Sequence, residues 1–268
     1  MRTIAWIAVN VFRESVRDKV LYNLVLFAML MIGASYLLGQ LTAGQDYKIV
    51  IDLGLGAMSL FGLFIAVFIG IGLVSKEVER RSIYSLLSKP IHRYQLVLGK
   101  YAGLILTLIV NIAIMAAGLY AVMHYVAWQF PAEFVATWDV PPSDPRILKA
   151  VGLILMELSV VTAIALFFST FSTPILSAAF TFALWIAGHF SADLRNFEQV
   201  VQSPFAAKFA RGLYWVLPNL ASFDVKGQVV HGRPVEAGFV LLAVAYGLTY
   251  IAVLLIGAVT IFSRRDFK

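Results

Sequence analysis

The residues best suited to binding chemistry form one charged segment, Lys76 to Lys100, which lies between two long apolar runs. Acidic and basic side chains open the segment, and Ile83, Leu86 and Leu87 follow at the spacing of one helical face. Pro90 predicts the end of that helix. A charged helix of about three turns cannot enter lipid, and its leucines need a protein surface to cover them. The pattern therefore predicts docking of a partner rather than catalysis.

The alternative interpretation of this segment is a solvated loop that carries positive charge on the inner side of a membrane. That rule does not require acidic residues, yet Glu77 and Glu79 are present. A solvated loop would also leave the leucines in water. Both observations favour docking.

Glu157 is an ionisable residue about ten residues into an apolar run, where a charge is costly. Asn111 lies near mid-depth in the preceding antiparallel run and is the predicted hydrogen-bond partner of Glu157. We favour a packing bond between two helices, with Glu157 protonated or close to the outer water, because no cationic residue is expected at matching depth. The alternative is that Glu157 lines a translocation path.

Other chemistries find little support in the sequence. The four histidines, His92, His124, His189 and His231, are scattered, and the chain has no cysteine, so we expect no metal site. The GxxxxGK[ST] loop of ATPases is missing, because Gly99-Lys100 lacks both the earlier glycine and the following Ser or Thr. No convincing catalytic pair lies in the apolar runs. The chain is therefore not expected to be an enzyme.

The elements that position these residues are apolar helices. The chain is 60% hydrophobic and 13% charged, which indicates an integral membrane protein of the all-α class. We predict a single transmembrane domain over residues 1–268 with six transmembrane helices. The expected spans lie near 20–41, 53–75, 98–126, 147–170, 173–192 and 236–262. Pro174 fits the start of a helix, so the fourth and fifth spans are expected to form a tight antiparallel pair.

The distribution of Lys and Arg predicts that both termini are cytoplasmic. The net charge of +6 fits cytoplasmic loops near lipid headgroups better than nucleic-acid binding. The cytoplasmic set holds 13 of the 21 Lys and Arg residues: Arg2, Arg13, Arg17, Lys19, Lys76, Arg80, Arg81, Lys89, Arg93, Lys100, Arg264, Arg265 and Lys268.

The extracytoplasmic connections differ in character. Residues 127–146 are rich in proline and aromatics, which we interpret as interfacial anchors that are also placed to contact an extracytoplasmic accessory protein. The last loop, 193–235, is too long for a simple turn and predicts short helices, one of them over Ala206 to Leu217.

Residues 1–19 predict an amphipathic interface helix at the inner surface of the membrane. Phe12 lies on its apolar side, and Arg13, Glu14 and Arg17 lie mostly on the polar side. The helix is either a topogenic anchor or an element that also contacts a cytoplasmic partner. Separately, the small-residue spacing of Gly99 and Gly103 predicts that the third span packs closely against a neighbour.

Several motifs together resemble the permeases of type-2 ABC exporters. Their coupling-helix signature is matched by Glu77-Val78-Glu79, Arg81-Ser82-Ile83-Tyr84, Leu86-Leu87-Ser88-Lys89-Pro90, Arg93 and Gly99-Lys100. The resemblance extends to Phe12-Arg13-Glu14, Arg17-Asp18-Lys19, Leu217-Pro218-Asn219-Leu220 and Phe223-Asp224. Within this ABC-2 class the chain is most similar to the NosY-like subgroup.

The resemblance implies a permease subunit that dimerises and is coupled to separate ABC ATPase subunits, which bind ATP and Mg. It also implies a bacterial cytoplasmic (inner) membrane location. The cytoplasmic coupling helix would span residues 77–88, and the implied coupling residues are Glu77, Glu79, Arg80, Arg81, Ser82, Ile83, Leu86, Leu87, Pro90 and Arg93. The substrate and the choice between homodimer and heterodimer stay open. The alternative function is an ATP-independent membrane scaffold or channel-like protein.

Overall fold

The computed structural model describes residues 2–40, 46–79, 92–191 and 217–264, and the structural statements below concern these residues. They form helices and no strand. The long helices are α1 (Arg2–Val16), α2 (Lys19–Gly39), α3 (Asp46–Glu79), α5 (Arg93–Trp128), α7 (Pro145–Ser169), α8 (Pro174–His189) and α12 (Ala237–Arg264). The short ones are α6 (Ala132–Val135), the 3-10 helix η2 (Leu220–Phe223) and α11 (Lys226–Val230).

Five helices, α2, α3, α5, α7 and α12, are long and apolar enough to cross a membrane, and they coincide with five of the six predicted spans. The sixth predicted span corresponds to α8, which is apolar but has 16 residues. At a rise of about 1.5 Å per residue, α8 is shorter than a hydrocarbon layer of about 30 Å. The chain is thus a multi-pass membrane protein with five helices of full spanning length in its described part.

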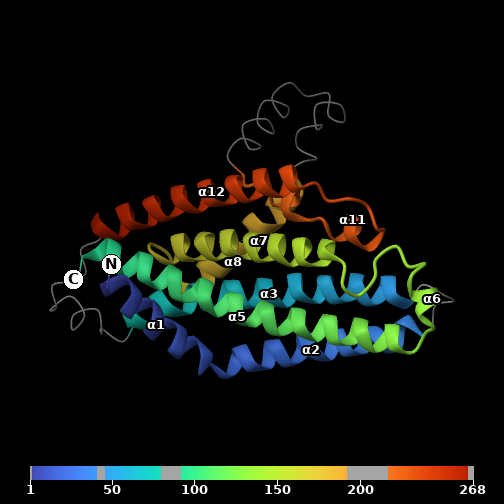
Figure 1. Cartoon of the computed structure of the whole chain (residues 1–268). Coiled ribbons are helices and arrows are strands. Elements are labelled where there is room, and N and C mark those ends of the chain that lie inside the picture. Colours follow the sequence, from blue (N-terminus) through green and yellow to red (C-terminus); the bar gives the residue numbers. More distant parts are fainter. Residues whose placement is uncertain (1, 41–45, 80–91, 192–216, 265–268) are drawn as a thin grey trace.

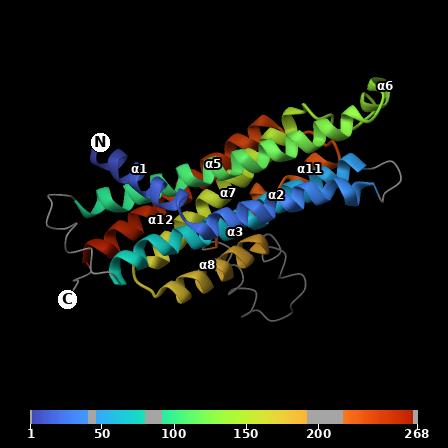
Figure 2. The ribbon, with the colours of Figure 1, turned by 90° about the horizontal axis from the view of Figure 1, so that it is seen from below.

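The long helices form an elongated bundle (Figure 1). The N-terminus of α1, the start of α5 and the end of α12 lie together at one end, which we name the terminal end; α6 lies at the opposite, far end. Helix α7 is central, since 78% of its most apolar stretch is buried, compared with 22% for α2 and for α12. Figure 2 shows α1 against α5 on one side of the bundle and α8 beyond α3 on the other.

The predicted antiparallel pair is formed by α7 and α8. Helix α7 ends at Ser169, and Pro174 occupies the first turn of α8, where its missing N–H costs nothing. The two helices pack against each other. This prediction from the spacing of the apolar runs and from Pro174 is confirmed.

Close packing at the predicted glycines is also confirmed, and the neighbour is α1. A Cβ atom on Gly99 would lie 2.7 Å from Cβ of Ile7, and one on Gly103 would lie 2.6 Å from the carbonyl oxygen of Ala8. Val11 is buried at the same contact. The apolar face of α1 is therefore covered by another helix of the same chain, a contact that the amphipathic pattern alone did not indicate.

Short helices occupy the described part of the long connection before α12. They are η2 and α11, and Gly188 of α8 packs so tightly on this connection that a Cβ there would lie 2.8 Å from the carbonyl oxygen of Pro218. The predicted helix over 206–217 lies outside the described residues except for its last residue.

Candidate functional site

The segment predicted to dock a partner lies at the terminal end, and the structure describes only its flanks. Helix α3 continues without a break to Glu79, so Glu77 and Glu79 lie in its last turns and not at the start of a separate helix. Lysine and glutamate are good helix formers, and α3 contains no proline and no glycine after Gly72 that would end it earlier. The other predicted coupling residues between Arg80 and Pro90 lie outside the described residues.

Arg93, the last of the predicted coupling residues, joins two helices. Its Nη1 atom donates to the carbonyl oxygens of Phe262 and Ser263, each at 3.0 Å. The last carbonyls of a helix have no partner within it, and a cation at this position also interacts favourably with the helix dipole. Arg93 therefore connects the start of α5 to the end of α12.

The predicted interface residues lie in the last turn of α1 and just after it, beyond the contact of Val11 with Gly103. Phe12 is half-buried, whereas Arg13, Glu14 and Arg17 are exposed to solvent on the side of α1 that α5 does not cover. The terminal end thus brings together α1, the start of α5 and the end of α12 (Figure 1). Any force applied to the start of α5 is transmitted to both of the other helices through direct contacts.

A second group of functional interest surrounds Glu157, whose side chain is 1% exposed. Its Oε1 atom accepts a hydrogen bond from Nε1 of Trp185 at 2.9 Å, and Nε2 of His189 lies 3.5 Å from the same oxygen. Both partners come from α8, where they are four residues apart and share a face. Glu157, Trp185 and His189 are named here the buried polar cluster.

Two parts of the sequence-based interpretation of Glu157 are therefore wrong. Asn111 does not bind Glu157; its Nδ2 atom donates to the carbonyl oxygen of Thr107 in its own helix, at 2.6 Å. An ionisable nitrogen, that of His189, does lie at the depth of Glu157. The prediction failed because Glu157 faces α8 rather than α5. The burial of Glu157 leaves the protonated form as the remaining one of the two predicted alternatives.

Two further charged groups act electrostatically on Glu157, those of Asp224 and Lys226 before and at the start of α11. The ammonium of Lys226 lies 3.6 Å from Oδ2 of Asp224 and 3.3 Å from the hydroxyl oxygen of Ser59 on α3. The connection before α12 therefore brings polar groups against the interior of the bundle.

The far end is held by a set of interactions that we name the far-end clasp. The ring of Tyr47 on α3 stacks on Trp138, with centroids 4.6 Å apart and planes inclined by 7°. Next to it, the ammonium of Lys48 lies 2.8 Å from Oδ2 of Asp139. The hydrogen bond from Lys48 lowers the pKa of Asp139 below its ordinary value.

Arg146 is the centre of the clasp. Its Nη2 atom donates to Oδ2 of Asp144 at 2.6 Å and to the carbonyl oxygen of Asp139 at 2.8 Å, and Nη1 donates to the carbonyl oxygen of Gly232. The bond from Arg146 also lowers the pKa of Asp144. Gly232 has a φ of +66°, and a Cβ there would lie 2.8 Å from Cβ of Asp139, so this close approach requires glycine.

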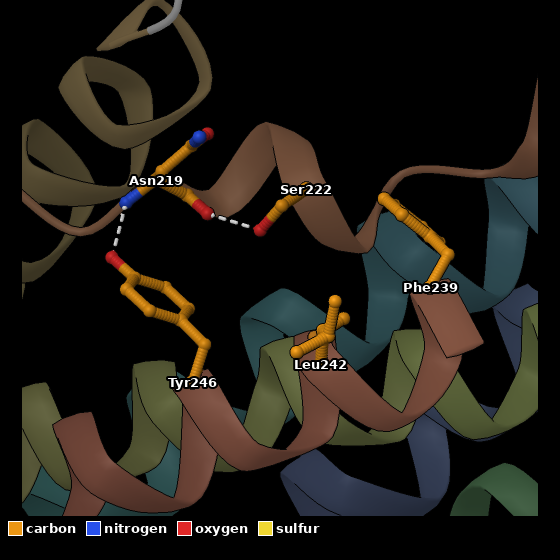
Figure 3. A pocket seen from close by; sticks show the side chains of 6 residues that line it. Asn219, Ser222, Phe239, Leu242 and Tyr246 are labelled. Atoms are coloured by element: carbon orange, nitrogen blue, oxygen red, sulfur yellow. Dashed lines mark hydrogen bonds between the residues drawn. The ribbon is translucent and has the colours of Figure 1, made fainter.

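An open pocket of about 280 Å³ lies between η2 and α12 (Figure 3). Its apolar wall is formed by Phe239, Leu242 and Ala243 of α12. The hydroxyl of Tyr246 accepts a hydrogen bond from the backbone N–H of Asn219 at 2.9 Å, which ties the Leu217–Asn219 motif to α12. The pocket thus results from the attachment of this motif to α12, and its main polar atoms already make hydrogen bonds within the protein.

The described residues contain no group of three or more His, Asp or Glu side chains able to hold a metal ion. The histidines make separate contacts. His124 and His231 each contact the carbonyl oxygen four residues earlier in their own helix, whereas His189 joins the buried polar cluster.

Comparison with known protein families identifies the family of this chain. Residues 5–267 match the family model described as ABC-2 family transporter protein. This match covers nearly the whole chain, including every long helix of the bundle. No curated protein matches the sequence significantly.

Proposed function

The chain belongs to the ABC-2 transporter family, and on that premise we propose that it is the permease subunit of an ABC transporter, coupled to separate ATPase subunits. The family match over residues 5–267 is the observation that carries the proposal. In this role two permease subunits form the membrane core, and ATP and Mg bind to the partner chains. The permease contributes no catalytic group to ATP hydrolysis.

The arrangement of the terminal end supports this role. The proposed docking segment begins in the last turns of α3 and precedes α5 in the sequence, so a partner bound there would act on both flanking helices. Arg93 connects α5 to α12, and the glycines of α5 connect it to α1. A rigid displacement of the segment by a partner would therefore move four helices together, which is what conversion of ATPase motion into a change of membrane conformation requires.

We assign the coupling contacts to the acidic and apolar side chains of residues 77–88. Glu77, Glu79 and the arginines that follow supply charge complementarity, and Ile83, Leu86 and Leu87 supply the apolar contact. Arg93 has a different role in this proposal: it transmits the displacement to α12 rather than contacting the ATPase.

The direction of transport, the subgroup within the family and the membrane in which the chain lies are part of the same proposal. The concentration of Lys and Arg near the terminal end supports a cytoplasmic location for both termini, in a bacterial inner membrane. The motifs quoted above support a NosY-like exporter that dimerises. Exposed aromatics at the far end, such as Trp128 and Phe134, are placed to contact an extracytoplasmic accessory protein or lipid headgroups.

Because the chain has no cysteine, a single cysteine can be introduced for site-specific crosslinking, and no native cysteine has to be removed first. We would co-express the Ser82→Cys variant with an ABC ATPase that copurifies with the wild-type chain and add a short maleimide–succinimidyl ester crosslinker, which joins the cysteine to a nearby lysine of the ATPase. The matched control is Thr137→Cys, an exposed position at the far end. The expected result is a crosslinked permease–ATPase product from Ser82→Cys and none from Thr137→Cys.

A product from both positions or from neither would contradict docking at this segment. If no ATPase copurifies with the wild-type chain under conditions that preserve membrane complexes, the ATP-independent scaffold becomes the better interpretation.

A further inference from the structure

The positions of the hydrogen-bonding atoms in the buried polar cluster fix where protons are needed. Nδ1 of His189 lies 3.1 Å from the carbonyl oxygen of Trp185. A carbonyl oxygen can only accept, so Nδ1 must carry a hydrogen to make this bond. In a neutral imidazole the other nitrogen, Nε2, then has no hydrogen. This is the nitrogen that faces Glu157.

Without a further proton, the contact between the two side chains would be repulsive. Nε2 of His189 lies 3.5 Å from Oε1 of Glu157, so a lone pair would face an ionised carboxylate that is 1% exposed. The N–H of Trp185 already donates to Oε1 at 2.9 Å, but one neutral donor does not compensate a buried charge. One added proton resolves the conflict, either as an imidazolium–carboxylate pair or as a carboxylic acid that donates to Nε2.

Within the described part of the chain, the neighbouring charges do not replace that proton. There, besides His189, the charged groups near Glu157 are Lys226 and Asp224, from the connection before α12. These two lie 3.6 Å apart and largely offset each other. Ser59 from α3 approaches Lys226 and carries no charge.

We propose that Glu157 and His189 form a proton-binding site that holds one exchangeable proton between Oε1 and Nε2 at neutral pH. The proton joins the middle of α7 to the end of α8. His189 is 22% exposed and Glu157 is 1% exposed, so exchange with solvent takes place through the imidazole. Loss of the proton leaves a buried carboxylate opposite a lone pair, and the contact between α7 and α8 weakens. The site is separate from the terminal end and does not depend on the coupling role proposed above.

Nuclear magnetic resonance of the purified full-length protein at neutral pH tests the proposal directly. Labelling the histidine ring nitrogens with 15N and the glutamate carboxyl groups with 13C distinguishes protonated from unprotonated forms of both groups. The Glu157→Gln and His189→Gln variants assign the two resonances. Glutamine has the shape of the protonated glutamate and keeps an oxygen that accepts from Trp185, so the first variant preserves the packing of the cluster.

The expected wild-type spectrum shows one proton in the pair: a protonated Nε2 with ionised Glu157, or an unprotonated Nε2 with Glu157 as the carboxylic acid. An ionised Glu157 opposite an unprotonated Nε2 would overturn the proposal, and so would a pair in which both groups are protonated. The protonation states are read from the wild-type chain, and the variants serve to assign its two resonances.

His124 provides the matched reference within the same molecule. Its Nδ1 atom makes the same contact with the carbonyl oxygen four residues earlier, that of Tyr120, at 2.8 Å, and in the described residues no carboxylate faces its Nε2. In the Glu157→Gln variant, the 15N resonances of the His189 ring should match those of the His124 ring. A His189 that stays protonated at Nε2 in this variant would show that Glu157 does not hold the proton, which contradicts the proposal.

Discussion

The two ends of the bundle are held together by different kinds of contact. At the far end, Arg146 forms charged hydrogen bonds to three separate points of the chain, each with its own direction and length. At the terminal end, α1 lies on the glycine surface of α5, and one arginine caps α12. Charged bonds to several partners define a single arrangement, whereas the terminal end has one charged attachment and its helices are joined mainly by packing.

This difference indicates where the molecule can move. An element that is driven by a partner at one end of a bundle needs a fixed point at the other end, or the displacement is lost in rigid rotation of the whole subunit. The far-end clasp is suited to be that fixed point, and the terminal end is suited to be the part that moves. Substitutions at the two ends should therefore differ in what they change.

The largest effect is expected for Arg146→Gln. The substitution leaves the carboxylate of Asp144, which is 7% exposed, without its cation, and it removes the bonds to the carbonyl oxygens of Asp139 and Gly232. Because Arg146 is 24% exposed, the loss should be somewhat below that of a fully buried pair, about 3 kcal/mol in the free energy of unfolding. Thermal unfolding in detergent would measure it.

The control for this variant is Arg13→Gln, at an exposed position of α1. It should change stability by less than about 0.5 kcal/mol. Equal unfolding temperatures for the two variants would mean that the clasp does not fix the far end.

A smaller loss is expected for Gly103→Ala, which is aimed at the terminal end. The new methyl group would lie 2.6 Å from the backbone oxygen of Ala8, so α1 must move away from α5. We expect a loss of about 2 kcal/mol from this overpacking. In Gly152→Ala, the control, the methyl group meets nothing within 4 Å, and that variant should gain about 0.5–1 kcal/mol. A gain in both variants would show that α1 is not held at this position.

The long helices and the contact at Gly99 and Gly103 could be predicted because they depend on local patterns. A run of about 20 apolar residues has the length of a membrane span, and two small residues four apart leave a groove on one helical face. Neither inference requires knowledge of which helix is the neighbour. The cap that Arg93 places on α12 joins residues 169 positions apart, and no local pattern indicates it.

The contact between Glu157 and Trp185 in the buried polar cluster could have been predicted from the sequence. Glu157 lies 12 residues before the end of α7, and Trp185 lies 11 residues after the start of α8. A short antiparallel connection places positions at equal distance from the turn side by side, so this count identifies Trp185 as a neighbour of Glu157. The same count does not apply to Asn111, because the connection between α5 and α7 is long and irregular and does not fix which residues of the two helices face each other. The prediction for Asn111 therefore depended only on its expected depth in the membrane.

The next prediction concerns the cap on α12. Arg93→Gln removes the cation from the carbonyl oxygens of Phe262 and Ser263, and the expected loss is about 1 kcal/mol, typical of a helix cap or a charge at a helix end. Its mechanical effect should exceed its effect on stability, because α12 would no longer follow α5. Distances between spin labels on α5 and α12, measured with and without ATP in the complex with the ATPase, would show this. Distance changes identical to those of the wild type would exclude a transmitting role for Arg93.

The smallest effect concerns pH and isolates one ion pair of the clasp. The pKa of Asp144 is lowered in the folded chain by Arg146, so the stability that this pair contributes is fully present above the ordinary carboxyl value of 3.8. It is lost as the pH falls below 3.8 through the lowered value, because the folded state must then take up a proton that the unfolded state already holds.

Asp144→Asn keeps an oxygen that can accept from the N–H of Arg146 at the start of α7 but cannot titrate. Below pH 3.8, the unfolding temperature of the wild type should therefore fall more steeply with decreasing pH than that of Asp144→Asn, and parallel curves would mean that the pair contributes no pH-dependent stability. If the curves diverge while Arg146→Gln follows Asp144→Asn, the acid sensitivity of the far end arises from this pair and not from the exposed pair of Lys48 and Asp139.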